Sequence, residues 1–145
     1  MIEAKPPRPD QMVRPLAAAS KIRVVIAEDH TIMRYTLRSI LKHYPEIEIV
    51  GEATDGEDAV AKAKELRPAI MLMDINMPRL DGIAATRRIT ENSNRVSVIG
   101  LSVDAEACSV DAMMRAGAAA VVPKERAAED LYDAIHRASA LLPAM

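Results

Sequence analysis

Five side chains able to take part in polar chemistry each follow a short apolar segment of this chain. Glu28 and Asp29 come after a β-branched run, Asp74 ends a run of four apolar residues, and Ser102 and Lys124 follow two later runs. Apolar runs without polar alternation are typical of strands buried on both faces of a parallel sheet. Since parallel strands of one sheet end at the same edge, we expect these five side chains to share one pocket.

The chemistry of this set is that of phosphoryl transfer beside a metal ion. Three clustered carboxylates repel one another, which raises their pKa values. A hard divalent cation relieves the repulsion, and a site with many oxygens and few protein ligands suits Mg²⁺. Asp74 could then attack a phosphorus atom and form an acyl phosphate. Mg²⁺ and Lys124 would neutralise the phosphoryl oxygens, and Ser102 would donate a hydrogen bond to one of them.

The elements that must position these groups alternate regularly between residues 21 and 142. Apolar, β-branched runs predict five strands, and apolar residues at helical spacing predict a helix after each. Such alternation implies right-handed βαβ units, so we expect an α/β fold whose parallel sheet is covered by helices on both faces. Gly117 has the position of a C-terminal helix cap. The expected strands are 22–27, 47–50, 69–73, 96–101 and 119–122, and the expected helices are one ended by Pro45 and then 57–67, 82–91, 106–116 and 127–142.

Length and composition predict one domain and argue against several kinds of partner. Residues 1–20 carry four prolines among charges and predict a flexible tail, 21–142 form the domain, and 143–145 are its C-terminal end. The formal net charge is −2 and only 2% of residues are aromatic, so direct DNA binding by this chain is not expected. No apolar run approaches the ~18 residues of a membrane span, and no signal peptide is recognisable, so we expect a cytoplasmic protein.

Four short motifs contain or follow the site residues: VVIAEDH at 24–30, MDINMP at 73–78 with Asp81-Gly82, Leu101-Ser102, and AGA at 116–118 followed by Pro123-Lys124. With these motifs the chain, from about Lys21 to Leu142, resembles the receiver domain of a two-component response regulator. The residues before Thr31 and the loop after Asp74 are most similar to the subfamily that carries a C-terminal helix-turn-helix of the LuxR type (NarL/FixJ). The resemblance implies a flavodoxin-like (βα)5 three-layer sandwich with five parallel strands in the order 2-1-3-4-5.

The resemblance also implies a role for each site residue. Asp74 becomes the phosphoacceptor for a partner histidine kinase. Asp29 and Asp74 become direct Mg²⁺ ligands, Glu28 acts mostly through water, and the backbone carbonyl of Asn76 is a further ligand. Lys124 pairs with the phosphate, and the hydroxyl of the strand-end serine, Ser102, is the switch group.

The expected output is a switch in dimerisation or partner binding, with transcription controlled through an effector domain absent from this chain. On this view the chain is not an enzyme, although it accepts a phosphoryl group and assists its own phosphorylation and dephosphorylation. Two alternatives stay open: a single-domain regulator acting through protein contacts, and a degenerate receiver serving as a constitutive interaction module. A phosphatase of the haloacid dehalogenase type is disfavoured, because Asn76 stands where those enzymes have a second aspartate.

Three positions depart from the common receiver pattern. Val121 stands where many relatives have a Tyr or Phe that rotates on activation, and we expect it simply to pack in the core. Val103 follows the switch serine, where relatives usually have a small residue, and it is expected to slow the entry of phosphodonors and water. Glu125 replaces a proline that often follows the lysine and with it a candidate for a cis peptide bond.

Overall fold

The computed structural model of the protein describes residues 21–93, 95–103 and 107–142. The predicted tail, 1–20, and the end, 143–145, lie outside the described residues. Strands and helices alternate as the sequence pattern predicts. The elements are β1 (Ile22–Ala27), α2 (Thr31–Leu41), β2 (Ile47–Ala53), α3 (Gly56–Leu66), β3 (Ile70–Asp74), α4 (Gly82–Asn92), β4 (Ser97–Ser102), α5 (Ala107–Arg115), β5 (Ala120–Pro123), the 3-10 turn η1 (Lys124–Arg126) and α6 (Ala127–Ala140).

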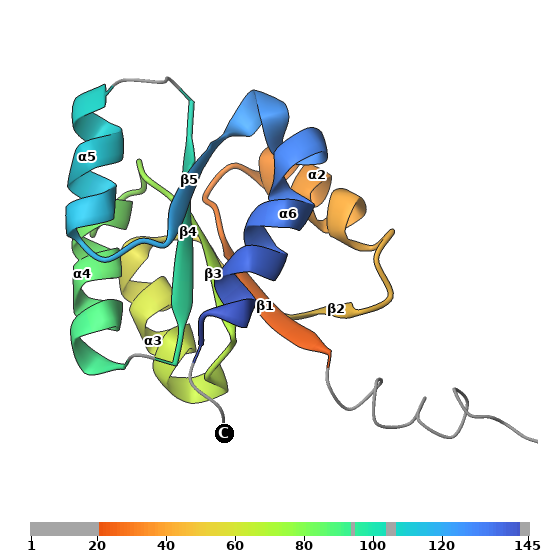
Figure 1. Cartoon of the computed structure of the whole chain (residues 1–145). Coiled ribbons are helices and arrows are strands. Elements are labelled where there is room, and N and C mark those ends of the chain that lie inside the picture. The colour runs from red at the N-terminus through yellow and green to blue at the C-terminus, as the bar shows by residue number, and fades with distance from the viewer. Residues whose placement is uncertain (1–20, 94, 104–106, 143–145) are drawn as a thin grey trace, which may run out of the picture.

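The five strands form one parallel sheet in the order β2-β1-β3-β4-β5. Helices α2 and α6 cover one face of the sheet, and α3, α4 and α5 cover the other (Figure 1). This is the doubly wound α/β arrangement that the alternation of strands and helices implies, and it confirms the predicted three-layer sandwich.

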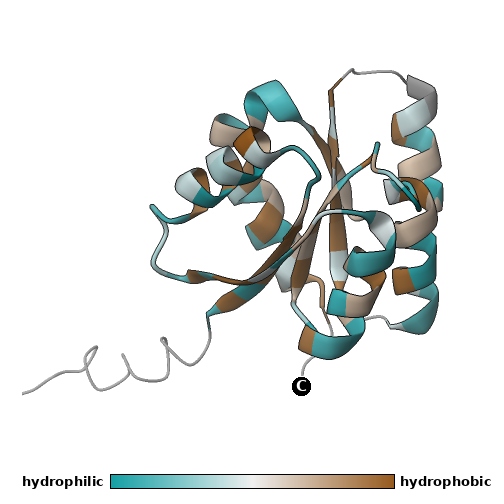
Figure 2. Ribbon diagram, turned by 180° about the vertical axis from the view of Figure 1, so that it is seen from behind, coloured by the Kyte–Doolittle hydropathy of each residue, from teal (hydrophilic) through white to brown (hydrophobic). Residues whose placement is uncertain are grey.

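Two separate hydrophobic clusters hold these layers together. Alternate side chains of a strand point to opposite faces, so Met71 and Met73 of β3 join one cluster whereas Ile70 and Leu72 join the other. All five residues of β3 are buried. Hydrophobic residues accordingly concentrate along the strands at the centre of the molecule (Figure 2). Aliphatic side chains fill both clusters, with buried methionines in the cluster under α3, α4 and α5, whereas Tyr44 and Tyr132 are partly buried against the other cluster.

Two helix ends use a side-chain cap and a glycine cap, the first at the start of α4 beside the site and the second after α5 at the opposite edge of the sheet. The Asp81 carboxylate accepts a hydrogen bond of 2.8 Å from the Ala84 amide and caps the start of α4. Gly117 follows α5 with φ +114°, a backbone conformation that favours glycine, and this agrees with its predicted role as a cap.

The prediction for the second strand was too short. β2 continues past Val50 to Ala53, because every residue of β1 has a partner in β2. The register shifts between Val24 and Val25, and the second half of β1 pairs with residues 51–53. The added residues, Gly51-Glu52-Ala53, carry no apolar run, so pairing with a neighbouring strand determines the structure there and local preference does not. None of the helices in the described part of the chain is long and apolar enough to cross a bilayer.

Candidate functional site

The five side chains singled out in the sequence lie at the carboxyl ends of the strands. Glu28 and Asp29 directly follow β1, Asp74 is the last residue of β3, and Ser102 is the last residue of β4. Lys124 directly follows β5. Since β1, β3, β4 and β5 run parallel and neighbouring strands are paired, these ends lie along one edge of the sheet.

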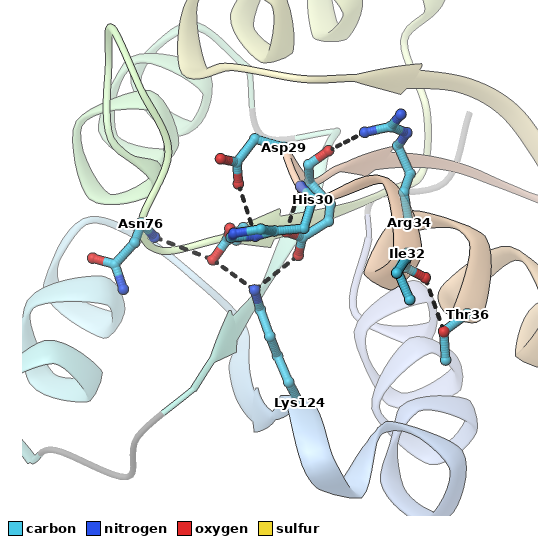
Figure 3. A network of polar contacts seen from close by, with 9 residues as sticks. Asp29, His30, Ile32, Arg34, Thr36, Asn76 and Lys124 are labelled. Carbon is cyan, nitrogen blue, oxygen red and sulfur yellow. Dashed lines mark hydrogen bonds and ion pairs between the residues drawn. The ribbon is translucent and has the colours of Figure 1, made fainter.

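Lys124 joins two buried carboxylates. Its Nζ lies 2.9 Å from Glu28 Oε1 and 3.2 Å from Asp74 Oδ1, and only 12% of the lysine side chain is exposed. Figure 3 shows Lys124 reaching up from its 3-10 turn to these contacts. Burial lowers the pKa of Lys124, but the hydrogen bond to Glu28 and the charges of both carboxylates outweigh this effect. Its pKa therefore lies above the ordinary value of 10.5, and the lysine is positively charged.

One cation cannot fully compensate the buried acids. Burial and the negative charge of Glu28 raise the pKa of Asp74 from 3.8 to about 6, although Lys124 and the Asn76 amide act in the opposite direction. The Asn76 amide donates a hydrogen bond of 3.2 Å to Asp74 Oδ1. The other oxygen, Oδ2, is buried and has no hydrogen-bond partner among the described residues. The charged form of Asp74 is thus disfavoured, and a second cation would stabilise it.

His30 lies across the same acidic cluster. Its Nδ1 is 3.1 Å from Glu28 Oε2 and 3.3 Å from Asp29 Oδ1, and its backbone amide donates a hydrogen bond of 3.2 Å to Glu28 Oε2. The contact to Asp29 has the distance of an ion pair but lacks the geometry of a hydrogen bond. The His30 side chain is 71% exposed, whereas that of Asp29 is 27% exposed. The sequence pattern places His30 in the VVIAEDH motif but does not predict its contacts with Glu28 and Asp29.

The acidic cluster has the composition of a metal site. Glu28, Asp29, His30 and Asp74 each offer one ligand atom, and these atoms all lie within 4.8 Å of one another. Asp29 Oδ1 is buried and accepts no hydrogen bond from the described residues. Buried carboxylate oxygens are normally paired or bound to a metal. The three carboxylates therefore fit a hard divalent cation.

Ser102 is buried on the other side of Asp74. The residue is 4% exposed, and its Oγ has no hydrogen-bond partner among the described residues. It is paired with Pro123 of β5, the residue directly before Lys124. A buried hydroxyl without a partner costs stability, so an unused donor at this position indicates a group kept for a ligand.

Two of the departures from the receiver pattern lie within β5 and directly after β4. Val121 is half-buried and packs against the cluster between the sheet and helices α3–α5, in agreement with the expectation that it packs in the core. Val103 follows Ser102 and is 59% exposed at the rim. Its effect on the entry of phosphodonors and water stays a prediction.

Comparisons with known proteins agree with this geometry. Residues 24–136 match the family described as "Response regulator receiver domain". The chain is 36% identical over 116 residues to the transcriptional regulatory protein DegU of Brevibacillus brevis. It is similar in structure to the signal receiver domain of the putative response regulator NarL from Mycobacterium tuberculosis, with a TM-score of 0.80 and 26% identity over 84% of this chain and 98% of that one. A LuxR-family response regulator from Aurantimonas also has a TM-score of 0.80, with 28% identity over 87% of this chain and 90% of that one.

The curated relatives are longer than this chain. The match with DegU takes in 80% of this chain but 49% of DegU, and the chain thus spans about half the length of that relative. The NarL and LuxR-type neighbours agree with the subfamily that the sequence motifs indicate.

Proposed function

Since the chain belongs to the response regulator receiver family, we propose that Asp74 accepts a phosphoryl group from a histidine kinase in a Mg²⁺-dependent reaction. The observation that carries this proposal is that the two carboxylate oxygens of Asp74 differ in their contacts. Oδ1 is held by Lys124 and the Asn76 amide, whereas Oδ2 is buried without a hydrogen-bond partner among the described residues. Contacts to one oxygen orient the carboxylate, and the other oxygen is available to act as the nucleophile.

The metal would be held at the acidic end of the site. Asp29 and Asp74 are the proposed direct ligands, Glu28 acts through water, and the backbone carbonyl of Asn76 completes the protein's share. When bound, Mg²⁺ supplies positive charge that offsets the clustered carboxylates and the phosphoryl oxygens. The raised pKa of Asp74 supports this assignment, because a second cation favours the ionised, nucleophilic carboxylate.

The chain's own residues then carry the transfer. Asp74 Oδ2 forms a bond to phosphorus, the bond between phosphorus and the kinase histidine nitrogen breaks, and the electron pair of that bond returns to the imidazole. Lys124 neutralises charge on the phosphoryl oxygens, and the Ser102 hydroxyl donates a hydrogen bond to one of them. In this reaction Ser102 gains a hydrogen-bond partner for a buried hydroxyl that has none among the described residues.

The proposed output is a change in dimerisation or partner binding that controls transcription through an effector domain outside this chain. Support comes from the transcription regulator DegU, of which this chain matches about half. In this proposal residues 21–142 form the receiver, flanked by 1–20 and 143–145, and the protein works in the cytoplasm without contacting DNA or membrane through the receiver. The intact site argues against a degenerate receiver, because such a module has no need of a lysine between two buried acids.

Incubation with acetyl phosphate and Mg²⁺ tests the phosphoacceptor. Intact-mass measurement should show the gain of one phosphoryl group, lost again on treatment with hydroxylamine and absent when EDTA replaces Mg²⁺. The Asp74→Asn variant should not gain the group, whereas the matched Asp111→Asn variant, altered at an exposed position of α5, should react like the wild type. A mass gain that persists in Asp74→Asn would refute the assignment of the nucleophile.

A further inference from the structure

Arg34 contacts the backbone that carries the two strand-end acids. It lies in the first turn of α2, and its Nη1 donates a hydrogen bond of 2.9 Å to the carbonyl oxygen of Glu28. Figure 3 shows Arg34 directed toward a carbonyl next to the acidic cluster. Only 17% of its side chain is exposed, so the contact is largely shielded from water.

The carbonyl of Glu28 has a particular need for this donor. β1 ends at Ala27, and the Glu28 amide makes one further bond of 3.0 Å to the Ala53 carbonyl. The Glu28 carbonyl lies past the paired residues of β1, where no neighbouring strand supplies a donor. A shielded backbone carbonyl must find a partner or cost stability, and Arg34 supplies that partner. The bond also fixes the peptide plane between Glu28 and Asp29, from which both carboxylates extend.

Glu52 holds Arg34 in place from the neighbouring strand. Arg34 Nε donates a hydrogen bond of 3.1 Å to Glu52 Oε1, so one guanidinium bridges Glu52 and the Glu28 carbonyl. Arg38, one turn further along α2, donates its Nε to the other oxygen, Oε2, at 2.7 Å, and its Nη2 contacts the same oxygen. The planar guanidinium presents donors in a fixed fork, which suits a bridge between two acceptors. Glu52 lies in the part of β2 that the sequence did not predict as strand.

We propose that Arg34 is a positioning residue for the metal and phosphoryl site. By binding the Glu28 carbonyl, with Glu52 as its anchor, it holds the Glu28-Asp29 pair in the orientation that receives the cation. The inference rests on the proposed function, since it assumes that these acids bind Mg²⁺. Removing a group that hydrogen-bonds to a metal ligand typically weakens metal affinity about 10- to 100-fold. Because Arg34 acts through the backbone, we expect its removal to have an effect at the low end of this range.

Mg²⁺ titration of the whole chain, followed by amide NMR shifts, tests this role. Arg34→Gln should weaken Mg²⁺ affinity about tenfold. Arg38→Gln is the matched control, because it removes the same charge and also a bond to Glu52, yet Arg38 makes no contact with the Glu28 carbonyl. The control should change the affinity less than about twofold. Arg34→Lys should recover part of the affinity, since an ammonium can donate to the carbonyl but cannot bridge to Glu52 in the same geometry.

Thermal melting of each variant separates positioning from folding. Arg34 and Arg38 both anchor α2 to β2, so both variants should lose stability, but only Arg34→Gln should lose Mg²⁺ affinity as well. Should Arg34→Gln fail to fold, Glu52→Ala serves instead: it keeps Arg34 but removes the oxygen that accepts its Nε hydrogen bond. A Mg²⁺ affinity of Glu52→Ala equal to that of wild type would overturn the proposal. Equal Mg²⁺ affinities of Arg34→Gln and Arg38→Gln would also overturn it. Absence of Mg²⁺ binding by the wild type would instead refute the proposed function itself.

Discussion

Replacing Asp74 by asparagine should stabilise the fold in Mg²⁺-free buffer. Burial and the neighbouring charge of Glu28 raise the pKa of Asp74 from 3.8 to about 6. The folded state therefore favours the protonated, neutral acid more than the unfolded chain does. Between pH 3.8 and about pH 6 the folded protein keeps a proton on Asp74 that the unfolded chain has released. The free energy of unfolding therefore falls as the pH rises through this range. Above about pH 6 the whole penalty is present.

The size of the penalty follows from the same values. Each tenfold change in proton affinity corresponds to about 1.4 kcal/mol, so a rise from 3.8 to about 6 is worth at most about 3 kcal/mol. Asparagine removes the charge but still buries a polar group, and it weakens the contact with Lys124 at 3.2 Å. We therefore expect Asp74→Asn to raise the free energy of unfolding by about 1–2 kcal/mol at neutral pH.

Urea denaturation followed by far-ultraviolet circular dichroism measures this difference. The chain has no tryptophan, so helix content is the more suitable signal. The stability gap between variant and wild type should be largest near neutral pH and should narrow toward about pH 4, where the wild-type carboxyl is protonated in the folded state. Saturating Mg²⁺ should stabilise the wild type by mass action and reduce the gap. The exposed change Asp111→Asn should alter stability little at either pH.

Two results would refute this reasoning. A variant less stable than wild type at neutral pH would mean that Asp74 gains more from Lys124 than it loses to burial and to Glu28. A gap of the same size at about pH 4 and at neutral pH would mean that the gain comes from packing or from the unfolded state, because a charge effect must follow the protonation of the carboxyl.

Three further predictions concern single side chains. Ser102→Ala should leave stability unchanged or slightly higher, since its Oγ has no partner among the described residues, while slowing phosphorylation by acetyl phosphate about tenfold or more in a mass-spectrometric time course. Val103→Ala should shorten the half-life of the acyl phosphate by opening the exposed rim, and an unchanged half-life would count against a gating role. Tyr132→Phe should lower the melting temperature, because the Tyr132 hydroxyl donates a 2.6 Å hydrogen bond that lowers the pKa of Glu46. A lowered carboxyl pKa stabilises the fold above the unfolded pKa of 4.5, so the loss of stability should fade as the pH falls below this value.

The sequence was informative where a local pattern and a general rule of topology act together. Asp74 could be assigned to a strand end because four apolar residues precede it, and parallel strands then bring it to the same edge as Lys124. The same rule placed Ser102 correctly, although the burial of its hydroxyl without a partner among the described residues could be learned only from the packed structure.

The missed features all depend on contacts distant in the sequence. Glu52 has no apolar neighbours that mark a strand, and its place in β2 comes from pairing with β1. Its contacts with Arg34 and Arg38 join residues 18 and 14 positions apart, so no helical or strand spacing indicates them. A charged residue in an unrecognised strand segment, together with two arginines one turn apart on the preceding helix, is the signal that could have suggested this pairing.

Backbone contacts hold the acidic residues of the site close together although their negative charges repel. At the end of β3, Gly82 packs so closely that an added Cβ would lie 2.0 Å from the carbonyl oxygen of Asp74, and its amide donates a hydrogen bond of 2.7 Å to the Ile75 carbonyl. At the end of β1, Arg34 binds the carbonyl of Glu28 at 2.9 Å. These contacts hold the backbone on both sides of the acidic cluster, so the repulsion between the carboxylates is not relieved by separating the two strand ends. Relief has to come from a proton, a cation or a change at the Asp74 carboxyl, and each of these alters the stability of the whole fold. A site built in this way can couple the chemical state of one aspartate to the conformation of the surrounding helices.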